Sequence, residues 1–218
     1  MKEFVKQLIK HTPLYPSLYN LRVRQVKRKR EREQLAEWER QGRPAPPPHP
    51  VKQRNLRRYA REYGLRVLVE TGTYLGDMVE AMKRDFDEIY SVELGQELYE
   101  QAKLRFASEP HVKLLQGDSG VVLKQIVDGL DRPALFWLDG HYSAGITAQG
   151  EKDTPIYEEL AHILNAPDLG HVILVDDARN FGSDPAYPTL EELKEFVNSK
   201  RPSRITVEDD SIRIVPAR

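Results

Sequence analysis

The sequence predicts an α/β fold built on an open, mostly parallel sheet with helices on both faces. Three observations lead to this prediction. Short apolar runs alternate with segments of helical period five times, the chain ends in two apolar runs around a polar turn, and a proline-rich stretch precedes the whole alternation. Strand and helix alternation is typical of a parallel sheet, whose crossovers are helices, and two neighbouring strands with a short turn form an antiparallel hairpin.

The individual elements follow from their patterns. The expected strands are short, mostly apolar runs, at 66–69, 88–92, 112–115, 134–138 and 171–175. The expected helices have apolar residues three or four positions apart, at 77–84, 97–107, 119–130, 154–165 and 189–199. The closing hairpin pairs 204–207 with 212–215 around the acidic turn 208–211. Ligands of open parallel sheets bind beyond the carboxyl ends of the strands, so functional residues are expected directly after the apolar runs.

Length and composition set the outer bounds. A chain of 218 residues is long enough for one sizeable domain with an appendage. It contains no cysteine, which excludes a disulfide framework, cysteine-ligated zinc and a thiol nucleophile, so any metal would be held by oxygen or histidine. No apolar stretch approaches the roughly 20 residues that span a bilayer, and the first residues lack a secretory signal pattern. We therefore expect a cytoplasmic protein.

The charge is unevenly distributed. Residues 1–43 contain 12 Lys and Arg against 5 Asp and Glu, whereas the rest of the chain has 21 against 29. The basic run at 22–30 and the mixed-charge segment after it are typical of a solvated helix, and Phe4, Val5, Leu8 and Ile9 give an earlier helix an apolar stripe. One interpretation is a surface helical extension. The other is recruitment to an anionic membrane surface, peripherally at the inner membrane, or to a protein partner.

A domain boundary is expected at the proline-rich stretch. The sequence there favours an extended, polyproline-like spacer. We therefore expect a basic helical extension at 1–43, a linker at 44–50 and one α/β domain at 51–218. Nucleic acid is disfavoured as a partner of the extension, because its aromatic residues are not interleaved with the basic ones. Homo-oligomerisation stays open.

An acidic residue follows or closes each of the five expected parallel strands. These residues are Glu70, Glu93, Asp118, Asp139, and the pair Asp176 and Asp177. A single acid at such a position is readily explained as a helix cap or turn former, but five in succession are less readily explained that way. The turn at 70–76 has glycines for close approach, yet it lacks the lysine of a phosphate-binding loop and the spacing of a dinucleotide fingerprint. A ligand with a cationic or hydroxyl-rich end suits these acids better.

The ordered motifs resemble the class I S-adenosylmethionine (SAM)-dependent methyltransferases, which have a Rossmann-like fold. The resemblance covers 66–215 and rests on the acidic, glycine-containing turn, the second acid for the ribose hydroxyls and Gly117-Asp118-Ser119 for the adenine. It implies a SAM site that includes Glu70, Thr71, Gly72, Thr73, Gly76, Glu93, Asp118, Ser119 and Asp139. Thr73 departs from the common glycine at that place, as in the metal-dependent O-methyltransferase branch.

That branch also holds a divalent ion with acids after the fourth and fifth strands. Asp139, Asp176 and Asp177 match these positions, with an Asp-Asp pair as in macrolide-sugar enzymes. The resemblance therefore implies a magnesium site, since oxygen ligands suit Mg²⁺, with a catalytic role for Asp139. His141, two residues after Asp139, is the candidate general base, because the pKa of an unperturbed histidine is about 6.5. The alternative is a structural role, in which the acids cap helices or pair with Arg179. The polar loop 142–153 is a candidate lid, and Tyr187 a candidate pocket residue.

These implications favour a SAM-dependent methyltransferase that acts on an oxygen, with a sugar hydroxyl on a small molecule or glycan as acceptor. Two alternatives stay open. One is a vestigial cofactor-binding or scaffold protein recruited through its basic helices, and the other is an NAD or nucleotide-sugar enzyme of similar topology. The intact strand-end residues argue against the first, and the spacing of the turn argues against the second.

Overall fold

The computed structural model describes residues 15–140 and 155–217, and the chain divides into two units at 1–51 and 52–218. Seven of the described helical segments are α-helices and one is a short 3-10 helix. They are α2 (Tyr15–Arg40), α3 (His49–Tyr63), α4 (Asp77–Met82), α5 (Gln96–Arg105), α6 (Ser119–Asp128), α7 (Ile156–Asn165), η1 (Ala178–Asn180) and α8 (Leu190–Lys200). The strands are β1 (Val67–Thr71), β2 (Glu88–Glu93), β3 (Val112–Gln116), β4 (Ala134–Leu138), β5 (Val172–Val175), β6 (Ser203–Glu208) and β7 (Ser211–Pro216).

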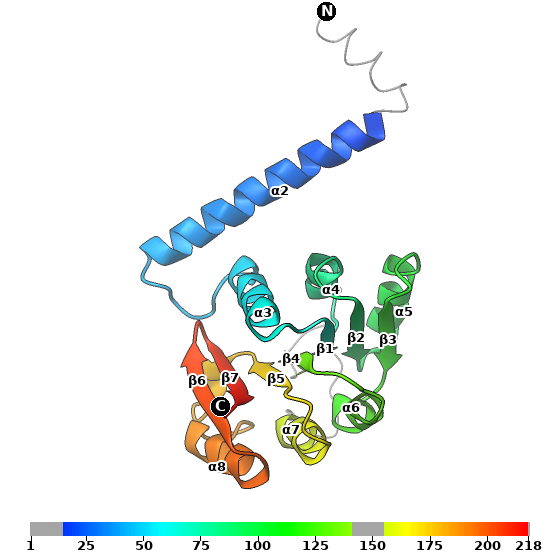
Figure 1. Ribbon diagram of the computed structural model, residues 1–218. Helices are drawn as coiled ribbons and strands as arrows, with labels where there is room; N and C mark the ends of the chain where they lie inside the picture. The colour runs from blue at the N-terminus through cyan, green and yellow to red at the C-terminus, as the bar shows by residue number, and fades with distance from the viewer. Residues whose placement is uncertain (1–14, 141–154, 218) are drawn as a thin grey trace, which may run out of the picture. The chain divides into compact units, whose positions relative to one another are not determined.

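The strands form one seven-stranded sheet in the order β3-β2-β1-β4-β5-β7-β6 (Figure 1). β1 to β5 run parallel to one another, and β7 lies antiparallel to both β5 and β6. The strand order reverses between β1 and β4, which is where open sheets of this kind bind ligands. The predicted α/β class, with its closing antiparallel hairpin, is confirmed.

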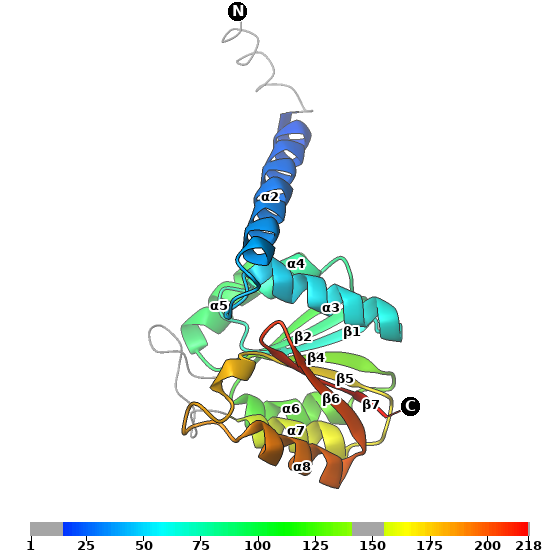
Figure 2. The same cartoon turned by 90° about the vertical axis from the view of Figure 1, so that its left-hand side faces the viewer.

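Helices cover both faces of the sheet because side chains along the buried strands alternate between them (Figure 2). On one face Leu68, Leu135 and Trp137 pack with apolar residues of α3, α4 and α5. On the other face Val69 and Phe136 pack with α6, α7 and α8. The continuous burial of β1, β4 and β5 therefore reflects two cores that share one sheet.

Backbone hydrogen bonds continue past the ends of the parallel strands. The N–H of Asp139 donates to the carbonyl of Thr71 at 3.2 Å, and the N–H of Asp176 donates to the carbonyl of Leu138 at 3.0 Å. The N–H of Gly117 likewise reaches the carbonyl of Glu93 at 2.9 Å. The residues that follow β1, β4 and β5 are thus tied to the same edge of the sheet.

The region before β1 differs from the expected linker. α3 begins at His49, so the last two residues of the predicted spacer are helical and the boundary between the two units falls within this helix. Proline is tolerated in a first helical turn, where its missing N–H would have no intrahelical acceptor, which explains how Pro50 opens α3. The apolar positions of α3, including Leu56, Tyr59 and Ala60, pack on the sheet and make the helix part of the domain core.

The first unit contains α2, a helix with charged residues along its described surface. Lys29 and Glu33 form an ion pair at 3.7 Å, and the indole N–H of Trp38 donates to the carbonyl of Pro44 at 2.8 Å. The predicted earlier helix, with Phe4 to Ile9, lies outside the described residues. Among the helices that the structure describes, none combines the length and apolarity needed to cross a membrane. Recruitment through 1–43 stays a prediction.

We expect truncation in the central strand to test how the sheet is stabilised. Leu135 on β4 is fully buried between neighbouring strands and helices, so Leu135→Ala removes apolar contacts and leaves a cavity. The expected loss in the free energy of unfolding is about 2 to 5 kcal/mol, measured by denaturant titration. Leu104→Ala on α5 is the matched control, because Leu104 is 80% exposed and its truncation should change stability by less than about 0.5 kcal/mol. Equal effects of the two changes would contradict the described core.

Candidate functional site

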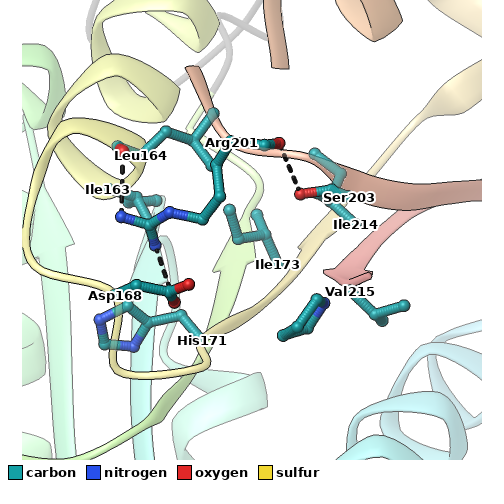
Figure 3. A pocket seen from close by; sticks show the side chains of 10 residues that line it. Ile163, Leu164, Asp168, His171, Ile173, Arg201, Ser203, Ile214 and Val215 are labelled. Atoms are coloured by element: carbon teal, nitrogen blue, oxygen red, sulfur yellow. Dashed lines mark hydrogen bonds and ion pairs between the residues drawn. The ribbon is translucent and has the colours of Figure 1, made fainter. Parts of the chain in front are cut away.

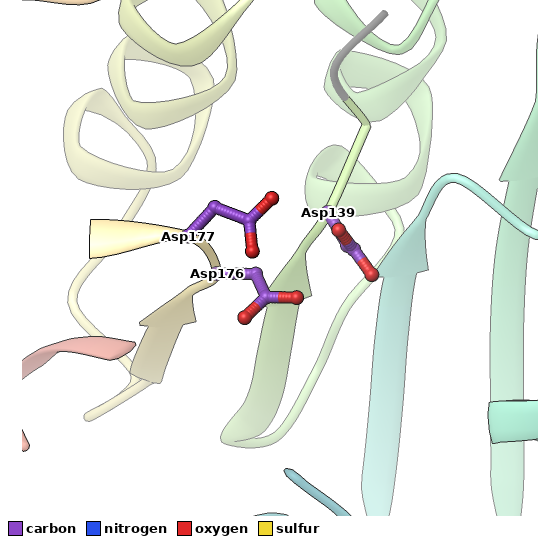
Figure 4. Close-up of side chains that lie close together, drawn as sticks. All are labelled: Asp139, Asp176 and Asp177. Carbon is purple, nitrogen blue, oxygen red and sulfur yellow. The ribbon is translucent and has the colours of Figure 1, made fainter. Parts of the chain in front are cut away.

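Three aspartates meet at the carboxyl edge of β4 and β5. Leu138 of β4 pairs with Val175 of β5, so Asp139 and Asp176 are the next residues of two hydrogen-bonded neighbours. Each of Asp139, Asp176 and Asp177 offers a carboxylate oxygen, and these three oxygens lie within 4.8 Å of one another (Figure 4). The structure therefore brings together the three residues that the sequence resemblance implied as metal ligands.

Asp177 joins this cluster because the backbone leaves the strand at that residue. Successive side chains of a strand point to opposite faces, so two adjacent aspartates on a regular strand would point apart. Asp177 instead has a left-handed conformation with φ of 54° and begins the turn into η1. Aspartate adopts this conformation more readily than most residues, which makes the Asp-Asp pair suited to a site at a strand end.

Two basic side chains balance part of the negative charge. Lys52 of α3 forms an ion pair with Asp176 Oδ2, and its ammonium lies 3.8 Å from Asp177 Oδ1. Arg179 donates to Asp177 Oδ1 at 2.8 Å. The turn of the β6–β7 hairpin holds Arg179 in place, because Asp210 pairs with the guanidinium and accepts from the Arg179 backbone N–H at 2.8 Å. The sequence did not point to Lys52, whereas Arg179 was foreseen as a partner of the acids.

The pKa values of the clustered groups are shifted despite these basic partners. Burial, followed by the neighbouring charge of Asp176, raises the pKa of Asp139 well above its usual value. Burial also raises the pKa of Asp176, although Lys52 acts in the opposite direction. Burial by itself would lower the pKa of Lys52, but the attraction of Asp176 and Asp139 outweighs it and raises that pKa. The lysine is therefore an ammonium within a site of excess negative charge.

The cluster has the chemistry of a divalent-cation site. Asp176 Oδ1 is buried, and among the described residues no group donates a hydrogen bond to it. An unpaired buried carboxylate oxygen is costly, and a hard cation such as Mg²⁺ binds such oxygens. Asp139, Asp176 and Asp177 together exceed the charge of Lys52 and Arg179 by one unit if all five are ionised. The residues present thus fit a divalent ion.

The glycine-containing turn after β1 lies directly against this cluster. Gly72 has φ of 83°, and a Cβ placed there would be 2.5 Å from the backbone oxygen of Asp139. Only glycine fits such a backbone contact without displacing the β4 end. Glu70, which was expected after the first strand, lies within β1 and is fully buried. It accepts from the Ser91 hydroxyl at 2.6 Å, and Ser91 in turn lies 2.6 Å from the Thr73 hydroxyl oxygen.

Glu93 fixes the outer part of the same turn. Its two carboxylate oxygens accept from the backbone N–H of Tyr74 at 2.7 Å and of Gly95 at 2.9 Å. Tyr74 adopts φ of 49° and, like Leu75, remains 44% exposed. Each carboxylate oxygen can accept a second hydrogen bond, so Glu93 can hold the turn and still receive hydroxyl groups of a ligand.

Asp118 has the capping role that the sequence left open. It is the N-cap of α6, where its side chain accepts from the N–H of Gly120 at 2.8 Å, and Ser119 behind it is buried. Both residues lie at the start of the helix after β3, at the carboxyl edge of the sheet. A capping role and a ligand contact are compatible, because the second oxygen of the carboxylate stays available.

The structure places a further acid, which the sequence motifs did not predict, close to the end of β4. Glu159 of α7 is buried beside Gly140, where an added Cβ would lie 3.2 Å from Glu159 Oε1 and 3.0 Å from the Thr71 hydroxyl oxygen. An amphipathic helix that follows a strand-end acid could have drawn attention to Glu159. Burial raises the pKa of Tyr187, and the charges of Asp177 and Asp139 add to this effect. A place for Tyr187 in the pocket stays a prediction. His141 and the loop 142–153 lie outside the described residues.

A separate pocket at the opposite end of β5 is an element of packing (Figure 3). Arg201 there donates to the carbonyl of Leu164 at 3.0 Å and pairs with Asp168 at 3.3 Å. His171 Nδ1 accepts from the N–H of Ala134 at 3.0 Å, and burial lowers its pKa to about 4. These polar groups satisfy one another at the amino end of the strand, away from the acids.

Comparison with known proteins places the fold. No protein-family model and no curated protein matches the sequence. Among solved structures, an O-methyltransferase from Bacillus cereus in complex with S-adenosylhomocysteine (SAH) shares 18% identity over 85% of this chain and 90% of its own, with a TM-score of 0.54. The O-methyltransferase TomG from Streptomyces achromogenes, in complex with SAM, shares 18% identity over 87% of this chain and 89% of its own, with a TM-score of 0.53.

A third similar structure is the SAH-bound methyltransferase PaMTH1 from Podospora anserina, with 16% identity over 87% of both chains and a TM-score of 0.54. At these identities the comparisons establish the fold. The chain has the fold of the class I SAM-dependent methyltransferases, as the motif resemblance implied. The similarity spans most of this chain and most of each neighbour.

The buried Glu70 makes the stability of the folded protein depend on pH. Burial raises its pKa to about 8 from 4.5, so between these values the folded protein holds a proton that the unfolded chain has lost. The contribution of Glu70 to the free energy of unfolding is therefore fully present below pH 4.5. It is lost as the pH rises towards 8, by at most about 1.4 kcal/mol per pH unit.

Glu70→Gln removes the titrating group and keeps the shape of the side chain. We therefore expect the free energy of unfolding of the wild type, relative to that of Glu70→Gln, to fall between pH 5 and 8, as measured by urea titration. Subtracting the two profiles cancels the other titrating groups. Parallel profiles over that range would show that Glu70 is already ionised in the folded protein.

Proposed function

We propose that the protein is a SAM-dependent methyltransferase that transfers a methyl group to a hydroxyl oxygen. The observation that carries this proposal is the close approach of Gly72 to the backbone of Asp139, because a cofactor held by that turn would lie beside the acid cluster. A methyl donor held by the turn would lie next to an ion held by Asp139, Asp176 and Asp177. The SAM and SAH bound to structurally similar proteins support the choice of cofactor.

The turn and the residues after β2 and β3 would each contact a different part of the cofactor. The backbone from Gly72 to Gly76, where the glycine at each end has a left-handed conformation, would contact the methionine part. Glu93 would accept from the two ribose hydroxyls in charge-assisted hydrogen bonds, and Asp118 with Ser119 would border the adenine. SAM supplies an activated methyl group, which leaves the sulfonium sulfur as the new carbon–oxygen bond forms.

The acid cluster would position and activate the acceptor. Asp139, Asp176 and Asp177 would hold Mg²⁺, which when bound lowers the pKa of a coordinated hydroxyl. The acceptor hydroxyl loses its proton to a base, for which His141 is the candidate because of its place beside Asp139 in the sequence, and the products are a methyl ether and SAH. Alignment of the oxygen, methyl carbon and sulfur supplies most of the expected rate enhancement. A sugar hydroxyl on a small molecule or glycan is the acceptor class we propose, from the resemblance of the Asp-Asp pair.

Cofactor binding can be measured without knowing the acceptor. We expect calorimetry to detect binding of SAM and SAH by the full chain and no comparable binding of NAD. Glu93→Ala should weaken SAH binding by about 1.5 to 3 kcal/mol, because charged hydrogen bonds to the ribose are lost. Glu97→Ala is the matched control on the next helix, where the side chain is exposed. Tight binding of NAD with no binding of SAM or SAH would refute the assignment.

Metal dependence is the second measurable consequence. With a panel of hydroxylated sugars as acceptors, we expect SAH formation to fall to background in EDTA and to return with excess Mg²⁺. Asp176→Asn should abolish both the activity and its response to Mg²⁺, since it removes the charge of a buried ligand. Asp131→Asn, at an aspartate with a 93% exposed side chain, should behave as wild type. Undiminished activity in EDTA would remove the metal from the proposal and leave cofactor binding intact.

A further inference from the structure

Lys52 occupies an unusual position for a lysine on the first turns of a helix. Its side chain is 18% exposed and reaches across to the carboxyl edge of the sheet, where the ammonium pairs with Asp176 Oδ2. The same ammonium lies 3.8 Å from Asp177 Oδ1 and 5.9 Å from the centre of the Trp137 ring. It is thus surrounded by two proposed metal ligands and the face of an indole.

The carboxylate that Lys52 contacts is also the one with an unpaired oxygen. Asp176 uses Oδ2 for the ammonium, and Oδ1 is the buried atom that no described group satisfies. A divalent cation bound to Asp176 and Asp177 would therefore lie within a few ångströms of a positive charge on the protein. Two cations this close repel strongly where water is scarce.

We propose that Lys52 is a tethered counter-ion of the acid cluster that competes with the divalent cation and is displaced from Asp176 when the ion binds. This inference rests on the metal site of the proposed function. In the metal-free protein the ammonium offsets one of three clustered carboxylates. Ion binding must then break the pair between Lys52 and Asp176, so the lysine lowers the affinity of the site for metal.

A structural ion pair is the rival explanation, in which Lys52 only fastens α3 to the sheet. The two explanations differ in the effect of removing the charge. Lys52→Met keeps an unbranched, largely apolar side chain that can lie on Trp137 but has no ammonium. A structural pair predicts lower stability and unchanged metal binding, whereas competition predicts tighter metal binding.

The test uses the full chain and Mn²⁺ as the probe, with calorimetry as the measurement. We expect Lys52→Met to bind Mn²⁺ about ten-fold or more tightly than the wild type, and Lys52→Arg to bind it no more tightly. Lys124→Met is the control for net charge, since Lys124 pairs with Asp128 on the surface of α6, and its affinity should stay within about two-fold of wild type. Asp176→Asn should remove Mn²⁺ binding from either background.

Unchanged or weaker Mn²⁺ binding by folded Lys52→Met would overturn the proposal. Absence of Mn²⁺ binding in every variant would overturn it together with the metal site, and SAH binding in the same samples would show whether the methyltransferase assignment stands. If Lys52→Met does not fold, ¹⁵N resonances of the lysine ammonium groups provide a test on the wild type. The Lys52 resonance is assigned as the wild-type signal that is missing from the spectrum of Lys52→Arg. This resonance must shift when the wild type is saturated with Mg²⁺, and an unchanged resonance would overturn the proposal.

Discussion

The register of the three central parallel strands is the constraint on which the site depends. Thr71 pairs with Leu138, and Leu138 pairs with Val175, so the chain leaves β1, β4 and β5 at one level. Backbone hydrogen bonds bring the glycine turn and the aspartates to this level, and the side chain of Glu93 then holds the turn. A slip of one residue in β4 would move Asp139 away from both of its neighbours and turn each β4 side chain to the opposite face of the sheet.

Charge is the second constraint, because the register forces carboxylates together whether or not they attract a ligand. Lys52 and Arg179 come from opposite directions, one from the helix before β1 and the other from the turn after β5. Their positive charges reduce the repulsion but do not abolish it, because burial raises the pKa of Asp139 first and the charges of Asp176 and Asp177 raise it further, against Lys52. The three aspartates thus exceed the two basic partners by one negative charge when all five groups are ionised.

Much of the fold and part of the site could be predicted from the sequence, since both depend on local patterns. Apolar runs locate the strands, and a parallel sheet then brings Asp139 and Asp176 to one edge. Lys52 could not be foreseen in the same way, because its place depends on how α3 packs across the sheet, and the neighbouring prolines suggested a linker. Nor does any pattern show that Ser91 donates to Glu70, a contact between strands that fixes a buried acid.

The hairpin at the end of the fold has a consequence for biosynthesis. Asp210 lies in its turn and holds Arg179, which in turn neutralises Asp177. During translation the five parallel strands leave the ribosome before this turn exists. A nascent chain that ends before the turn therefore lacks the partner that holds the Arg179 guanidinium beside Asp177. Pairing of the final hairpin is therefore the step that fixes Arg179 next to the three aspartates, although the hairpin contributes none of them.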